Sequence, residues 1–224
     1  MFNLKIFVET LLGISQKKSL CRILQNYHSK RSNIYGNIIE FGAIPESNNN
    51  FSSIMKKKSI KKIFYSDKYL KNKDIIKADL NKKIDIQKNF FDNVLLFNVM
   101  EHLIDPENAK IQIRKILKKG GFLIGSSPFL YRYHGAPSDY LRFTKPFYSQ
   151  FFKKNFKLIK IENIGFGPFC VCYSLISDFT KKIPLINYFL FTFAFSLDYI
   201  LSKLVNYELK DIYPIAVNFK VKKK

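Results

Sequence analysis

The chain has 224 residues, of which 47% are hydrophobic and 16% aromatic, so it can form the core of one ordinary domain and global disorder is excluded. Its 38 Lys+Arg and 17 Asp+Glu residues give a formal net charge of +21, but the lysines are scattered and no basic-and-aromatic stacking module is visible. We therefore favour a solvated lysine-rich surface over a nucleic-acid groove. Three cysteines without a CxxC pair indicate neither a disulfide framework nor a zinc site, and they are typical of a cytoplasmic protein.

Residues 1–33 are predicted to form an N-terminal helical segment, followed by one domain over residues 34–224. The first 18 residues are partly apolar, but Glu9 interrupts them and no small-residue cleavage site follows. This pattern favours an amphipathic helix over a secretory signal.

Three short apolar runs follow, at 37–43, 61–67 and 91–98, and each ends on glycine or polar residues. The segment 47–59 between the first two runs has the length of a helix. Because such strands are apolar throughout and separated by helices, they predict a parallel sheet that is covered on both faces, which is a doubly wound α/β fold.

A helix is predicted over residues 105–119, after the third run. Asp105 is a suitable N-cap, Pro106 suits the first helical position, and Gly120-Gly121 is expected to end the helix. Residues 122–129 then read as a fourth strand. Thr144 is expected to cap another helix that begins at Pro146.

Two late strands are predicted at 156–165 and 213–222, as an edge pair, with a hydrophobic helical insertion at about 168–210 between them. Its most apolar part, residues 183–205, is long enough to span a bilayer, but it contains Asn187, Asp198 and Lys203. We favour a buried helix or one that forms a homodimer, with peripheral contact at the inner face of the membrane as the alternative.

Polar residues stand where the predicted strands end. In an open parallel sheet, ligands bind outside the carboxyl ends of the strands. Acids at successive strand ends suit a nucleoside, whose hydroxyl and amino groups need acceptors. The strand-end residues here are Glu40, Gly42, Ala43, Asp67, Asp79 and the run from Asn98 to His102.

The order of the segments IIEFGA, FYSD, KADL and FDNVLLFNVMEHLIDPENAKIQIRKILKKGGFLIGSSPF resembles that of class I S-adenosylmethionine-dependent methyltransferases of the type 11 group. The resemblance covers roughly residues 34–165, and YPIAVNFKVKKK is similar to the family's terminal strand. It implies a Rossmann-like sheet of seven strands with the last one antiparallel, methyltransferase activity, and S-adenosyl-L-methionine as the cofactor.

The resemblance also implies the roles of individual residues. Asp67 falls on the acid that binds the ribose hydroxyls, Asp79 lies near the adenine, and Asn98 to His102 form the wall beside the methyl group. The cofactor-binding residues implied in this way are Glu40, Gly42, Ala43, Asp67, Asp79, Asn98, Val99, Glu101 and His102.

The segment YHGAPSDYLRFT is expected to face the substrate, because its polar side chains lie in a loop after a strand end. The candidate substrate-binding residues are His134, Asp139, Tyr140 and Arg142. The alternative is a loop held by an ion pair between Asp139 and Arg142. If the methyl acceptor is a hydroxyl, His134 or His102 is the candidate catalytic base. No metal site is predicted, because the chain has only three histidines.

We therefore expect a methyltransferase acting on a small-molecule or cell-envelope acceptor, such as a sugar or a lipid-linked intermediate. The family's cofactor loop usually contains further glycines, whereas Ile44 and Glu46 occupy those positions here. An alternative is a non-catalytic methyltransferase-like subunit that binds a partner or a membrane. A weaker alternative, prompted by the positive charge, is an RNA methyltransferase.

Overall fold

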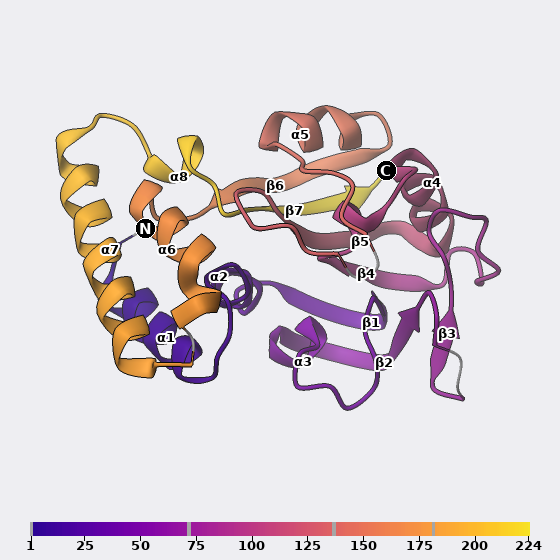
Figure 1. The fold of residues 1–224 in the computed structure, drawn as a ribbon. Coiled ribbons are helices and arrows are strands. Elements are labelled where there is room, and N and C mark those ends of the chain that lie inside the picture. Colours follow the sequence, from indigo (N-terminus) through magenta and orange to yellow (C-terminus); the bar gives the residue numbers. More distant parts are fainter. Residues whose placement is uncertain (1, 71–72, 136–137, 181) are drawn as a thin grey trace. The chain divides into compact units, whose positions relative to one another are not determined.

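A computed structural model describes residues 2–70, 73–135, 138–180 and 182–224 (Figure 1). Contacts divide the chain into two compact units. The sheet unit consists of residues 29–127, 134–162 and 218–224. The helical unit consists of the residues up to His28 together with 128–133 and 163–217.

The sheet has seven strands in the order β3-β2-β1-β4-β5-β7-β6. The first five are paired in parallel, and the last strand of the chain is antiparallel. This arrangement confirms the predicted fold, including the edge pair of late strands. The strands are β1 (Asn33–Phe41), β2 (Lys56–Asp67), β3 (Ile75–Lys77), β4 (Phe91–Phe97), β5 (Leu117–Pro128), β6 (Phe156–Ile164) and β7 (Ala216–Lys223).

The helices of the sheet unit cover both faces of its strands (Figure 1). On one face, α3 (Phe51–Ile54) packs against β1 and β4, and the ring of Phe51 stacks on Phe97 at 3.9 Å between centroids. On the other face lie α4 (Pro106–Ile116) and α5 (Lys145–Lys153), which are joined where the Lys110 ammonium donates to the Phe151 carbonyl at 3.0 Å. A short 3₁₀ helix, η1 (Met100–His102), follows β4.

Two helix starts agree with the predicted caps. Asp105 accepts a hydrogen bond from the Asn108 amide at 2.9 Å, and Thr144 accepts one from the Phe147 amide at 3.3 Å. Each cap satisfies a backbone N–H that has no partner within its own helix. The second helix begins one residue earlier than predicted.

The predicted helix at 47–59 is wrong apart from the single turn of α3. The segment has three asparagines in a row after Ser47, which are weak helix formers, and β2 already begins at Lys56. Gly120-Gly121 does not end α4 either, because that helix stops at Ile116 and the glycines lie within β5. The strand starts early because Leu117 pairs with Phe91 and the Lys118 ammonium lies 2.9 Å from the Asp92 carboxylate.

The helical unit has its own apolar core, which includes Leu24, Phe166 and Phe191. The predicted N-terminal helical segment forms two helices, and the hydrophobic segment forms a long one as expected. The helices are α1 (Leu4–Ser15), α2 (Leu20–Ser29), α6 (Pro168–Thr180), α7 (Pro184–Leu204) and α8 (Leu209–Ile212).

The polar residues Asn187 and Asp198 of α7 are buried, whereas many of its large apolar residues are exposed, so the interpretation as a buried helix is wrong. Only 22% of its apolar window is buried, although its length and composition would also allow it to cross a membrane. The Asp198 carboxylate accepts hydrogen bonds from the Phe169 and Cys170 amides at 3.0 and 2.8 Å, at the start of α6. Gly167 leaves the necessary space, since a Cβ there would lie 2.5 Å from Asp198 Oδ1.

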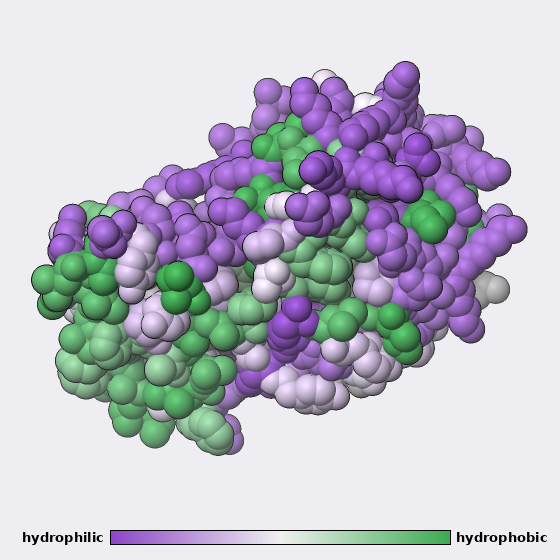
Figure 2. Space-filling view, turned by 90° about the horizontal axis from the view of Figure 1, so that it is seen from above, coloured by the Kyte–Doolittle hydropathy of each residue, from purple (hydrophilic) through white to green (hydrophobic). Residues whose placement is uncertain are grey.

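The outward side of α7 carries an apolar stripe with helical spacing. Figure 2 shows apolar side chains gathered over the helical unit, whereas hydrophilic ones dominate elsewhere. We call the apolar residues of this helix that are more than half exposed the α7 stripe. They are Leu185 (81% exposed), Phe189 (68%), Phe193 (55%), Ile200 (54%) and Leu204 (77%).

Replacing Asp198 by alanine should lower the free energy of unfolding by about 2 to 4 kcal/mol, because two backbone N–H groups lose a charged acceptor in a buried place. Urea unfolding followed by circular dichroism measures this change. The control is Glu208→Ala, whose exposed carboxylate lies 3.6 Å from Lys210 and should matter by less than about 1 kcal/mol. Equal effects of the two substitutions would contradict the assigned role of Asp198.

Candidate functional site

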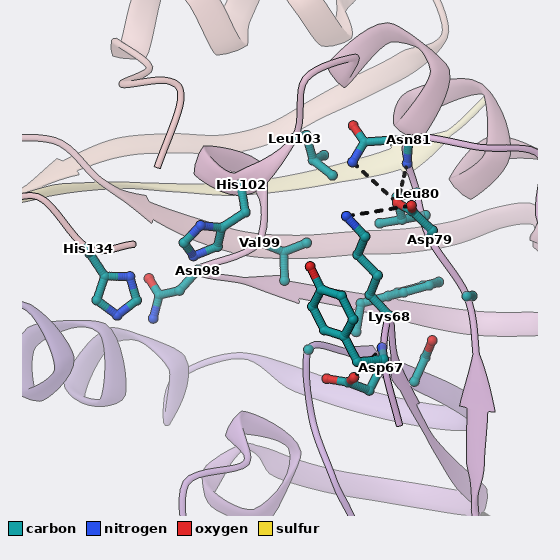
Figure 3. A pocket seen from close by; sticks show the side chains of 15 residues that line it. Asp67, Lys68, Asp79, Leu80, Asn81, Asn98, Val99, His102, Leu103 and His134 are labelled. Atoms are coloured by element: carbon teal, nitrogen blue, oxygen red, sulfur yellow. Dashed lines mark hydrogen bonds and ion pairs between the residues drawn. The ribbon is translucent and has the colours of Figure 1, made fainter. Parts of the chain in front are cut away.

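A cavity opens at the carboxyl edge of β1, β2 and β4 in the sheet unit (Figure 3). It encloses about 850 Å³ of space between atoms, part of which is open to solvent. This edge is where ligands bind in open α/β sheets. The lining residues are Phe41, Gly42, Ser66, Asp67, Lys68, Tyr69, Ala78, Asp79, Leu80, Asn81, Asn98, Val99, His102, Leu103 and His134.

Gly42 makes the turn after β1 possible. Its φ of +69° lies in the left-handed region, and its amide donates to the Ser66 carbonyl at 2.8 Å. A Cβ at this position would lie 3.1 Å from Val99 Cγ2. A larger residue would therefore be strained and would crowd the cavity wall formed by the segment after β4.

Two carboxylates border the cavity, as predicted. Asp67 follows β2, and its Oδ1 accepts hydrogen bonds from the Tyr69 and Leu70 amides at 2.7 and 2.9 Å, so it also holds the turn. Asp79 accepts a hydrogen bond from the Asn81 amide at 3.0 Å and lies 3.6 Å from the Lys68 ammonium. Both carboxylates are thereby held in fixed positions at the rim.

Three predicted cofactor residues, Glu40, Ala43 and Glu101, are missing from the described residues that line the cavity. The Glu40 carboxylate is buried and accepts hydrogen bonds from the Phe51 and Ser52 amides at 2.7 and 2.9 Å, so it anchors the N-terminus of α3. Ala43 is also buried. Glu40 therefore supports the loop after β1 by holding the start of α3, and it is not among the described residues that line the cavity.

Ile44 and Glu46, the residues at the usual glycine positions, are likewise not among the described lining residues. Ile44 is 42% exposed, and Glu46 is exposed with a φ of +61°. Glu46 thus adopts the left-handed conformation for which glycine is normally used. The loop takes a glycine-like path without glycine, at the cost of local strain.

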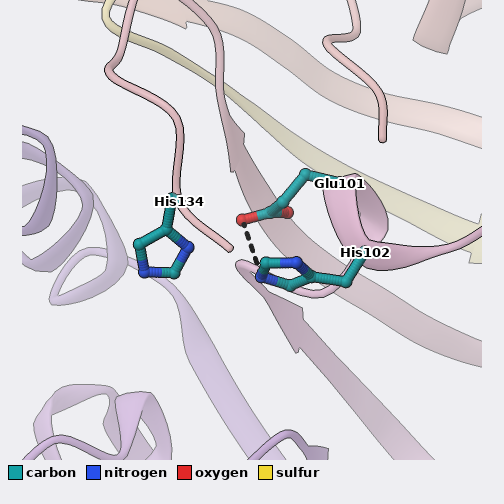
Figure 4. A group of neighbouring side chains, drawn as sticks. All are labelled: Glu101, His102 and His134. Atoms are coloured by element: carbon teal, nitrogen blue, oxygen red, sulfur yellow. Dashed lines mark ion pairs between the residues drawn. The ribbon is translucent and has the colours of Figure 1, made fainter. Parts of the chain in front are cut away.

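Glu101, His102 and His134 converge at one end of the site (Figure 4). Glu101 is fully buried, and burial, opposed by the positive charge of Arg142, raises the pKa of its carboxyl to about 8. The His102 Nε2 lies 3.9 Å from Glu101 Oε1, and the His102 and His134 ring centroids are 5.4 Å apart. His102 and His134 line the cavity, whereas Glu101 lies behind the described lining residues.

The loop expected to face the substrate is held against η1. The Tyr140 amide donates to the Glu101 carbonyl at 2.8 Å, and the Asp139 carboxylate accepts from the His134 amide at 2.9 Å and pairs with Arg142. Burial of Asp139 opposes its charge, but the hydrogen bonds from Arg142 and His134 hold its pKa below the ordinary value. The ion pair between Asp139 and Arg142 is thus present, and of the four candidate substrate-binding residues only His134 is among the described lining residues.

Several lining residues were not predicted, among them Lys68, Tyr69, Asn81 and Leu103. Tyr69 and Asn81 each stand two residues after a strand-end aspartate and donate a backbone N–H to it. This turn geometry is common for aspartate, so the spacing was a usable signal.

Part of the sheet unit is similar to a known domain family. Residues 49–125, about a third of the chain, match the family model described as a methyltransferase domain, of the type 11 group. No curated protein sequence matches the chain.

Solved structures share the fold. A S-adenosylmethionine-dependent methyltransferase from Mesorhizobium loti superposes with a TM-score of 0.52 at 9% identity, over 91% of this chain and 98% of that one. Haemonchus contortus phosphoethanolamine N-methyltransferase 2, in complex with phosphomonomethylethanolamine and S-adenosylhomocysteine, superposes with a TM-score of 0.52 at 15% identity. The match covers 89% of this chain and 52% of that one, so this chain spans about half the length of that enzyme. The cyclase SpnF gives 0.52 at 10% identity, over 91% and 81%.

At these identities the solved structures show the fold alone, and the family model covers residues 49–125. The chain therefore has the fold of class I S-adenosylmethionine-dependent methyltransferases, and residues 49–125 of its sheet unit are similar to the type 11 methyltransferase domain.

Proposed function

We propose that the sheet unit binds S-adenosyl-L-methionine in the cavity and transfers its methyl group to a small-molecule or cell-envelope acceptor. The observation that carries this proposal is the placement of Asp67 and Asp79 at the rim of one cavity, beside the close approach of Gly42 to Val99. The methyltransferase domain match and the S-adenosylhomocysteine bound to the Haemonchus enzyme support it.

The lining residues fit the chemical groups of the cofactor. Asp67 uses Oδ1 for the turn, and its Oδ2 is the atom that a ribose diol would reach. Asp79 offers a carboxylate acceptor to an adenine amino group. Asn81 lies beside it in the lining, with its Oδ1 accepting from the Ile104 and Asp105 amides. Asn98 and Val99 follow β4 on the way to the histidines, which is where the methyl-bearing end would lie.

The chain mainly has to position the reactants. S-Adenosylmethionine supplies a methyl group on a sulfonium, so the acceptor's lone pair forms a bond to the methyl carbon while the carbon–sulfur bond breaks and its electron pair goes to sulfur. Orientation in such a displacement can contribute about 7 to 11 kcal/mol. His102 and His134 are the cavity residues that can accept a proton from a hydroxyl acceptor near neutral pH.

Replacing Asp67 should weaken cofactor binding, because a charged acceptor for the ribose is lost. Asp67→Asn keeps an oxygen for the turn and should raise the Kd for S-adenosylhomocysteine by about 10-fold, and Asp67→Ala by about 10- to 100-fold. Isothermal titration calorimetry measures both. The matched control is Asp74→Ala, which removes the same charge from an exposed position of the sheet unit.

Absence of binding by the wild type at millimolar ligand would refute the proposal. The double substitution Ile44→Gly and Glu46→Gly then tests the rival function as a non-catalytic subunit. Binding gained on restoring the glycines would show a degenerate cofactor loop, and unchanged binding would count against degeneration.

We also propose that the α7 stripe lies on an anionic membrane surface, which would bring lipid-linked acceptors to the protein. The stripe consists of large apolar side chains that are more than half exposed, and the chain carries a net charge of +21. Apolar area combined with attraction to anionic lipid is the basis of interfacial helix binding.

Substituting Phe189 and Phe193 by serine should reduce partitioning to vesicles of phosphatidylserine and phosphatidylcholine at least about tenfold. The reason is that the variant lacks the apolar area that the two exposed rings would transfer from water into the membrane. Co-sedimentation measures the bound fraction. Ile111→Ser, at an exposed apolar position on α4, is the control and should change nothing. Unchanged partitioning of the double variant would contradict the membrane contact, and conversion of a dimer to a monomer in sedimentation velocity would assign the stripe to a second copy instead.

A further inference from the structure

Glu101, His102 and His134 bring three potential metal ligands together. One ligand atom from each side chain can be chosen so that all three lie within 4.8 Å of one another (Figure 4). Two imidazoles and one carboxylate form a mixed nitrogen and oxygen donor set. Such a set suits divalent first-row transition metals better than Mg²⁺ or Ca²⁺, which prefer oxygen donors throughout.

The hydrogen bond of His102 fixes which of its nitrogens can bind a cation. The Nδ1 atom lies 2.6 Å from the Ser138 carbonyl oxygen, which can only accept, so Nδ1 carries the hydrogen. In the neutral ring the lone pair is therefore on Nε2, the atom 3.9 Å from Glu101 Oε1. The same hydrogen bond from a histidine to a backbone carbonyl is the usual outer support of a metal-binding imidazole.

The Glu101 carboxylate is a buried acceptor that nothing nearby satisfies. The side chain is 0% exposed, and neither oxygen accepts a hydrogen bond from the part of the chain that the structure describes. A buried polar group without a hydrogen bond is costly. A cation between the carboxylate and the imidazole Nε2 would satisfy both acceptors at once.

We propose that Glu101, His102 and His134 bind a divalent first-row transition-metal ion, represented by Zn²⁺ and Mn²⁺. Metal–ligand bonds of about 2.0 to 2.2 Å at tetrahedral angles place two ligand atoms of one ion about 3.3 to 3.6 Å apart. The observed spread of up to 4.8 Å thus needs a contraction of roughly 1.2 to 1.5 Å, which side-chain rotation can supply.

The surrounding loop holds the three ligands in place. The Glu101 carbonyl accepts from the Tyr140 and Leu141 amides at 2.8 and 3.3 Å, and Asp139 holds the backbone of His134. The Asp139 side chain and the backbone of Tyr140 and Leu141 thus serve as a frame for the ion. Positions fixed by such outer contacts are what a preorganised metal site requires.

Three protein ligands leave coordination positions open for water or substrate. His102 and His134 line the cavity, so the open side of the ion would face it. If the proposed methyl transfer is correct, this arrangement selects an oxygen acceptor, because a bound hydroxyl loses its proton to solvent more readily. The histidines would then act as ligands rather than bases. Binding of the ion itself requires neither cofactor nor methyl transfer.

The experiment titrates the metal-free protein with Zn²⁺ and, separately, with Mn²⁺ by calorimetry, and records the visible absorption bands of bound Co²⁺. All proteins carry Cys172→Ser, which removes the exposed thiol as a competing ligand. We expect one ion per chain in this background. Glu101→Gln and His134→Gln should each weaken binding by at least about 100-fold, more than the loss of an outer contact causes.

His28→Gln is the matched control, because it removes the third histidine of the chain and should leave binding unchanged. Circular dichroism verifies folding, and Glu101→Gln should fold at least as well as wild type without metal, since the amide has the same shape and no charge to bury. No binding in the Cys172→Ser background, or binding that survives Glu101→Gln and His134→Gln, would overturn the proposal. Separate titration with S-adenosylhomocysteine distinguishes this failure from failure of the proposed function.

Discussion

The parallel register of β1 with both β2 and β4 is the constraint on which the site depends. Phe41 pairs with Ser66 on one side and with Leu96 on the other, so the three strands end at the same level. Gly42, Asp67 and Asn98 stand at the carboxyl ends of these strands and consequently lie at one edge of the sheet. A shift of one residue in either pairing would turn Asp67 or Asn98 to the opposite face and dismantle the cavity.

Burial on the two sides of the site has different consequences. The Glu40 carboxylate is buried but fully used by two backbone amides, so it is a structural support. Glu101 is buried without such donors from the described residues and lies beside an imidazole whose tautomer is set by Ser138. The oxygens of Glu40 are thus occupied by backbone amides, whereas the oxygens of Glu101 remain able to accept a hydrogen bond or bind a cation.

Much of the sheet could be predicted because its strands are continuous apolar runs bounded by turn residues, and Asp105 and Thr144 are local caps that can be read from the sequence. Asp67, Asp79 and His134 were found at the cavity because strand ends converge in a parallel sheet. The early start of β5 could not be predicted, since it depends on the distant partners Phe91 and Asp92.

The orientation of α7 escaped prediction for a related reason. Composition indicates that the segment is apolar but does not indicate which side is covered, and Asp198 faces inward only because the start of α6 supplies two amides. The Glu40 side chain likewise points toward the start of α3 because it accepts a hydrogen bond from the Phe51 amide, and no local sequence pattern predicts this contact. Long-range hydrogen bonds, rather than propensities, decided each of these cases.

A crystal structure of the protein grown with S-adenosylhomocysteine is the most direct test of cofactor binding in the cavity. We expect ligand density in the cavity, with the ribose hydroxyls on Asp67, the adenine beside Asp79 and Asn81, and the sulfur next to Asn98 and Val99 on the side of the histidines. An empty cavity at saturating ligand, or density at another surface of the chain, would contradict this expectation.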